Sequence, residues 1–109
     1  MKTNLGEFEE IVLLLVAAQH DKAYGLSITE AIENEIARSV TLSSVHTSLY
    51  RLEEKGFVQS RLGGASAIRG GRRKRFFTIT TSGKAALKKS LEVRQKLWDM
   101  IPEIVMEKI

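Results

Sequence analysis

The side chains that say most about the chemistry of this protein are cations, which lie together in one segment without acidic residues. Residues 60–83 carry six arginines and lysines and no aspartate or glutamate, whereas the whole chain of 109 residues has a net charge of only +4. Those cations are Arg61, Arg69, Arg72, Arg73, Lys74 and Arg75. Residues 1–40, by contrast, hold seven acids and three basic residues and sum to −4. Such a concentration of positive charge indicates a polyanionic partner.

Side chains that could carry out catalysis or hold a metal are scarce. The two histidines, His20 and His46, lie 26 residues apart, and the chain has no cysteine. A thiolate nucleophile, a disulfide and a thiolate metal site are therefore excluded. The glycine pairs at 63–64 and 70–71 precede a strand-like stretch and lack the Gly-Lys-Ser/Thr ending of a phosphate-binding loop. We expect no enzyme, no metal site and no cofactor.

A helix suited to reading DNA precedes the cationic segment. Its apolar positions step by 3, 4 and 3 residues, which is the helical period, and they define a buried face of Leu42, Val45, Leu49 and Leu52. A rotation of about 100° per residue then places mostly small or polar side chains on the opposite side. These are Ser43, Thr47, Tyr50, Arg51 and Glu54, flanked by Ser44 and His46. Small hydroxyl side chains keep a helix slim enough for a major groove.

The elements that must position this helix follow from the periodicity and the capping residues. We expect a first helix from a capping box of Asn4 and Glu7, and a second one starting at Ser27 or already at Tyr24. Thr41 caps the third helix and Gly56 ends it. Strands over 57–62 and 74–80 flank a glycine-rich loop, and a last helix from Thr80 ends or kinks at Pro102.

This order predicts a mainly α fold with a small β-hairpin. It is a winged helix-turn-helix plus a long C-terminal dimerisation helix. We expect one domain over 1–109, with the helix-turn-helix and wing in 4–80 and the dimerisation helix in 81–101. Residues 20–25 are predicted to be a turn.

The two terminal helices carry more apolar surface than one small chain can cover. The first helix is apolar over most of its circumference, and the last one has two neighbouring apolar seams. A second copy packed across a two-fold axis would cover both. The expected dimer contacts are Leu5, Phe8, Val12, Leu87, Leu91, Trp98 and Ile101. Trp98, the only tryptophan, serves either as packing there or as one of two indoles that stack on a planar aromatic effector.

Three stretches resemble the PadR-like transcriptional regulators, most closely the short branch with a single winged helix. They are Tyr24-Gly25, the run Val-His-Thr-Ser-Leu-Tyr-Arg-Leu-Glu-Glu-Lys-Gly over 45–56, and Arg-Gly-Gly-Arg-Arg-Lys-Arg-Phe-Phe-Thr-Ile-Thr-Thr-Ser-Gly over 69–83. The resemblance covers roughly residues 5 to 100. It implies a homodimeric repressor, held by its first and last helices, that responds to phenolic or drug-like small molecules. His46 stands where the family usually has tyrosine, as a plain N–H donor or as a pH sensor.

We therefore expect a sequence-specific DNA-binding regulator, a homodimeric repressor of a palindromic operator whose half-sites lie one helical turn, or a multiple of it, apart. The expected DNA contacts are Ser43, Ser44, His46, Thr47, Tyr50, Arg51, Arg69, Arg72, Arg73, Lys74 and Arg75. The alternative is a protein-interaction or dimerisation module without a specific DNA target, which would leave the acid-free segment unexplained. Single-stranded RNA is disfavoured because the segment lacks interleaved stacking aromatics.

Composition also predicts the compartment. The longest apolar run, residues 11–18, is 8 residues long and too short to span a bilayer. The absence of cysteine fits a reducing compartment. We expect a soluble, cytoplasmic protein that does not contact a membrane.

Overall fold

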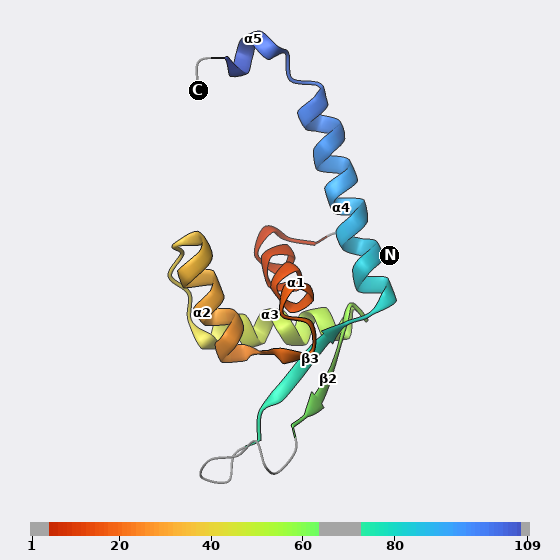
Figure 1. Ribbon diagram of the computed structural model, residues 1–109. Coiled ribbons are helices and arrows are strands. Elements are labelled where there is room, and N and C mark those ends of the chain that lie inside the picture. Colours follow the sequence, from red (N-terminus) through yellow and green to blue (C-terminus); the bar gives the residue numbers. More distant parts are fainter. Residues whose placement is uncertain (1–4, 64–72, 108–109) are drawn as a thin grey trace.

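The computed structural model describes residues 5–63 and 73–107. Helices predominate, with one small sheet, as the sequence predicted (Figure 1). The helices and the 3-10 turn are α1 (Glu7–Gln19), η1 (His20–Lys22), α2 (Gly25–Ile36), α3 (Leu42–Glu54), α4 (Thr81–Asp99) and α5 (Glu103–Met106). The strands are β1 (Ala23–Tyr24), β2 (Val58–Leu62) and β3 (Arg75–Ile79).

The core lies where α1, α2 and α3 pack on one another and on the sheet. Its fully buried side chains include Leu13 of α1, Ile32 of α2, Leu49 of α3 and Phe77 of β3. Val12, which we expected in the dimer interface, is also completely buried in this core. That expectation is wrong for Val12, because the chain's own core encloses its side chain and leaves none of it accessible to a second copy.

The ends of the helices show which capping predictions hold. Thr41 caps α3, because its Oγ1 accepts the Ser44 N–H at 3.0 Å, and Gly56 follows that helix with a φ of +81°, a conformation that favours glycine. Leu42, predicted to be buried, is 42% exposed, since the core contacts of α3 begin one turn later at Val45.

Two other helix starts differ from the predicted ones. α1 is capped at Gly6, whose N–H donates to Glu9 at 3.3 Å, so Glu7 does not close the expected box, and Asn4 lies outside the described residues. α2 runs from Gly25 with Tyr24 as its N-cap residue, close to the earlier of the two expected starts, and Ser27 Oγ accepts the Tyr24 N–H at 2.9 Å.

The sheet has three strands rather than the two of the predicted hairpin. Its order is β1-β3-β2, and both pairings are antiparallel. Residues 23 and 24, which we expected to lie in a turn, form β1 and pair with Phe77 and Phe76. A strand of two residues is too short to show an alternation of apolar and polar side chains, and β1 forms only because its backbone pairs with the edge of β3. We call β2 and β3 the wing strands.

A tight junction joins the wing strands to α4. The Thr80 N–H donates to the Phe57 carbonyl at 2.9 Å, and the Thr80 hydroxyl donates to the Gly56 carbonyl at 2.6 Å and accepts the Gly83 N–H at 3.0 Å. Gly83 is buried against this backbone, where a Cβ atom would collide with the Phe57 carbonyl oxygen. Glycine at 83 thus allows α4 to start directly on the sheet.

Beyond this junction α4 leaves the body of the molecule. Figure 1 shows it running away from the other helices, on the side opposite to the wing strands. The principal extents are 58 × 32 × 20 Å, and the radius of gyration is 16.4 Å, compared with about 13 Å for a compact domain of this length. Every residue from Leu91 to Val105 is exposed. Pro102 ends the helical run as predicted and caps the short α5.

Candidate nucleic-acid interface

The exposed face of α3 is a polar strip, as the sequence predicted. Ser43, Thr47 and Arg51 are exposed, and Tyr50 is 48% exposed. The Thr47 hydroxyl donates to the Ser43 carbonyl at 3.0 Å, which leaves its oxygen lone pairs facing outward as acceptors. Exposed hydroxyl and guanidinium groups such as these can form hydrogen bonds either with base edges or with phosphates.

Ser44 and His46 lie at the two margins of the polar strip. Ser44 is exposed, and its hydroxyl donates to the Thr41 carbonyl at 2.9 Å. His46 is half-buried, and its ring lies against Gly25 at the start of α2, where a Cβ atom would collide with the imidazole. His46 therefore packs between two helices of the helix-turn-helix, and Gly25 is small because this ring occupies the space beside it.

The wing strands are fastened to the side of α3. The rings of Tyr50 and Phe77 meet edge-on, with their centroids 6.2 Å apart. Further along the same helix, the Ser60 hydroxyl of β2 donates to Glu53 Oε2 at 2.7 Å, and Arg75 Nη1 of β3 donates to Ser60 Oγ at 3.0 Å. These contacts place Arg75 of β3 beside α3.

The described cations at the base of the wing divide between two networks. Arg75 belongs to the network with Ser60, whereas Lys74 lies over the ring of Tyr24 and Arg61 lies over the ring of Phe76. Arg73 is exposed. Two further predicted contact residues, Arg69 and Arg72, lie outside the described residues.

The acids of α1 are paired within the chain. Glu7 binds Arg38 at 3.1 Å, Glu9 binds Lys55 at 2.7 Å, and Glu10 binds Arg94 of α4 at 3.0 Å. These three ion pairs connect α1 to the segment before α3, to the end of α3 and to α4. Over residues 5–63 and 73–107, no ion pair involves a cation of the wing strands, so the acidic part of the sequence does not neutralise them.

Glu9 has a perturbed acidity for which the pair with Lys55 is chiefly responsible. Burial by itself disfavours the carboxylate, but the hydrogen bonds from Lys55 and from the Gly6 N–H, together with the positive charges of Lys55 and Arg51, outweigh it. The pKa of Glu9 is therefore lower than its ordinary value of 4.5. Arg51, at one margin of the polar strip, thus also contributes to the electrostatic field at α1.

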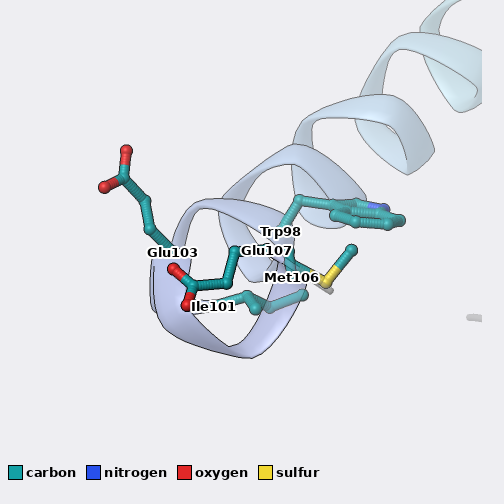
Figure 2. A pocket seen from close by; sticks show the side chains of 5 residues that line it. All are labelled: Trp98, Ile101, Glu103, Met106 and Glu107. Carbon is teal, nitrogen blue, oxygen red and sulfur yellow. The ribbon is translucent and has the colours of Figure 1, made fainter. Parts of the chain in front are cut away.

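A separate open hollow lies at the far end of α4, where the chain turns into α5. It has a volume of about 420 Å³ and is lined by Trp98, Ile101, Glu103, Met106 and Glu107 (Figure 2). Trp98 is 58% exposed, so its indole is open to a ligand or to another chain. In the part of the chain that the structure covers, no group of acids and histidines could hold a metal ion. No helix in that part is long and apolar enough to cross a membrane.

Comparison with known proteins decides the family. Residues 12–89 match the profile of the Transcriptional regulator PadR-like family. The chain belongs to this family. Its members are DNA-binding transcription regulators and not enzymes, so both the resemblance and the expectation of a non-enzyme are confirmed. No curated protein sequence is similar enough to count as a match.

Solved structures, PadR-like proteins among them, share the fold and confirm the predicted winged helix. PadR of Bacillus subtilis, crystallised in complex with operator DNA, is 26% identical with a TM-score of 0.65, over 77% of this chain and 46% of that one. The chain thus spans under half the length of that relative. The protein smu.1704 of Streptococcus mutans is also 26% identical, with a TM-score of 0.68, over 93% and 88% of the two chains. A PadR-like transcription factor from Bacteroides fragilis is 18% identical, with a TM-score of 0.71, over 84% of both.

Sequence reasoning missed the residues that hold this PadR-like interface in place. The ammonium of Lys74 is oriented by Tyr24, and Ser60 links Glu53 to Arg75. These contacts depend on the pairing register of the strands, which no local sequence pattern predicts. The cavity residues of α5 were missed as well. The signal that could have found them was Pro102 followed by an acid, a start for a new short helix.

Proposed function

We propose that this chain is a homodimeric repressor that binds a palindromic operator. The polar strip of α3 enters the major groove, and the wing contacts the adjacent backbone or minor groove. The observation that carries the proposal is the attachment of both wing strands to the side of α3. Phe77 of β3 meets the ring of Tyr50, and Ser60 of β2 donates to Glu53. The complex of the Bacillus subtilis relative with operator DNA supports it.

The DNA contacts in this proposal fall into two kinds. Ser43, Thr47 and Tyr50 can touch base edges, while Ser44, His46 and Arg51 lie at the margins and reach phosphates. Cations of the wing bind phosphates without regard to sequence. These are Arg73, Lys74 and Arg75, together with Arg69 and Arg72 from the segment outside the described residues.

The partner that covers α4 and α5 is a second copy of the chain. The exposed apolar side chains of these helices are Leu91, Val93, Leu97, Trp98, Met100, Ile101, Ile104 and Val105. A contiguous apolar surface of this kind is uncommon on a monomer and indicates a protein interface. Three of the expected dimer contacts pack against the chain's own core, namely Leu5, Phe8 and Leu87. The proposed dimer interface therefore depends more on the exposed side chains of Leu91, Trp98 and Ile101. A two-fold dimer presents two α3 helices, hence the palindromic operator.

The cavity beside Trp98 is the proposed effector site. This hollow of about 420 Å³ is wide open to solvent in one chain, so a ligand would lie against its wall. The exposed indole offers a stacking surface for a planar aromatic compound, and the carboxylates of Glu103 and Glu107 favour one that carries a positive charge. Because the cavity lies at the end of α4, occupation of it would change how two copies pack, and so release the operator. Such a regulator would act in the cytoplasm.

DNA titrations with two variants test the interface. Arg73→Ala should weaken binding to all duplexes about equally and lower the logarithmic salt slope by about 0.9, because one phosphate contact is lost. Thr47→Ala should instead change the preference among sequences. Lys88→Ala on α4 removes one charge away from the interface and is the control. If mixed-sequence duplex DNA does not bind at low salt, the proposal fails and a protein-interaction module is favoured.

The oligomeric state and the effector are tested separately. Light scattering should give the mass of two chains, and Leu91→Lys should reduce it to one, whereas Leu26→Lys, a similarly exposed leucine on α2, should not. A parent protein with the mass of one chain at micromolar concentration contradicts the dimer. Cationic planar compounds should quench Trp98 fluorescence more than neutral ones do. An unchanged signal across the panel contradicts the effector site.

A further inference from the structure

We propose that Tyr24 is a positioning residue for DNA binding, which holds the Lys74 ammonium in place for a phosphate. This inference rests on the proposed function, and it concerns a residue at the start of α2 that lies outside both the polar strip and the wing strands. Tyr24 acts through Lys74 and touches no base.

Strand register brings the participating side chains to one face of the sheet. Phe76 is paired with Tyr24 of β1 on one side and with Arg61 of β2 on the other, and directly paired residues point to the same face. Lys74 comes two residues before Phe76 and therefore shares that face, whereas Arg75 points to the opposite one. The register alone accounts for the separation of Lys74 and Arg75 into different networks.

The contacts on this face form a continuous stack. The rings of Tyr24 and Phe76 meet edge-to-face, 5.7 Å between centroids and 72° between planes. The Arg61 guanidinium lies 5.1 Å from the centroid of Phe76, and its Nη2 donates to the Asp21 carbonyl at 3.4 Å. At the other end, Lys74 Nζ lies 4.3 Å from the centroid of Tyr24 and donates to its hydroxyl at 3.3 Å.

This stack fixes a side chain that would otherwise be mobile. Lysine carries its charge on a flexible stem of four carbons, and ordering that stem on binding costs conformational entropy. The ring and the hydroxyl of Tyr24 hold the ammonium before DNA arrives, and one hydrogen bond to the hydroxyl leaves two of its three donors for phosphate oxygens. Tyr24 thereby reduces the entropic cost of the Lys74 contact.

The test compares variants of Tyr24 and Lys74 in titrations of a labelled mixed-sequence duplex at several salt concentrations. Lys74→Ala should lower the logarithmic salt slope by about 0.9. Tyr24→Leu should lower the slope in the same direction, and the double variant should bind no more weakly than Lys74→Ala alone. Tyr24→Phe keeps the ring and should retain most of the parent slope. A role in folding alone would not produce this pattern.

Controls separate this inference from the proposed function and from misfolding. Lys88→Ala should leave the slope unchanged, and thermal unfolding of each variant reports its stability. In the unbound parent, the Lys74 ε-methylene protons should be shifted upfield by the Tyr24 ring, a signature that needs no variant. Additive losses for Tyr24→Leu and Lys74→Ala, or an absent shift, overturn the inference alone. A parent that binds no DNA overturns the proposed function and the inference with it.

Discussion

Replacement of Gly83 by alanine tests how α4 is attached to the sheet. The added Cβ would collide with the Phe57 carbonyl oxygen and would lie 2.7 Å from Ile79 Cγ1. The Phe57 carbonyl cannot yield by a rotamer change, because it is backbone and accepts the Thr80 N–H at 2.9 Å. The start of α4 must therefore move away from the wing strands, or that hydrogen bond must lengthen.

The magnitude follows from three contributions. Forcing a methyl group into a filled site costs about 1–3 kcal/mol. Loss of the Thr80 hydrogen bond to Phe57 adds about 1 kcal/mol. The higher helix propensity of alanine returns about 1 kcal/mol. We expect Gly83→Ala to lower the free energy of unfolding by about 1–3 kcal/mol. For a urea m-value of about 1.5 kcal/mol/M, a loss of about 2 kcal/mol lowers the urea midpoint by roughly 1.3 M.

Urea unfolding followed by circular dichroism measures this change, at one fixed protein concentration because dimerisation would shift the midpoint. Ser82→Ala is the matched control, since residue 82 is exposed in the same turn of α4 and should change the stability by no more than about 0.5 kcal/mol. If Gly83→Ala is as stable as that control, α4 does not pack on the sheet through residue 83, and the reasoning is refuted.

Three further substitutions have defined outcomes. Glu9→Gln should lower the free energy of unfolding by at most about 1 kcal/mol near neutral pH. Because the pKa of Glu9 is lowered in the folded state, the stabilisation by the Glu9 carboxylate is complete above pH 4.5 and disappears as the pH falls below it. The unfolding curves of parent and variant should therefore converge in acid. Gly25→Ala should destabilise by about 1–3 kcal/mol through the collision with the His46 ring, and His46→Ala in the same chain should reverse most of that loss in thermal unfolding. Leu49→Ala removes a fully buried side chain and should cost about 2–5 kcal/mol in urea unfolding.

The helices were predictable because their signals are local. In α3 the apolar spacing, the cap at Thr41 and the glycine at 56 all lie within one stretch. The structure has the cap and the glycine in their expected roles and buries the apolar positions except Leu42. β1 was not predictable, since its two residues become a strand only by pairing with β3. The apolar circumference of α1 also could not show which stripe faces its own chain, which is why Val12 was assigned to the wrong surface.

The residue types of the candidate site were predictable from the sequence, but the residues that orient them were not. The cations of the wing and the small side chains of α3 are visible in the sequence, and whether they contact DNA stays a prediction. Their orientation depends on Tyr24 and Ser60, which reach Lys74 and Arg75 only through the register of three strands. Pairing between distant segments sets that register, so a one-dimensional pattern does not contain it.

The attachment of α4 at its first turns makes this helix a lever. Its 19 residues span about 28 Å, and its base is held at Thr80 and Gly83 and by Leu87 against the core. The residues of its outer half are exposed, and Arg94 there pairs with Glu10 of α1. A tilt of about 10° at that base would move the tip by about 5 Å over such a length. In a dimer joined through the tips, the separation of the two α3 helices would therefore be set by the angle at which α4 leaves the sheet, which the junction at Thr80 and Gly83 and the contacts of α4 with α1 fix together.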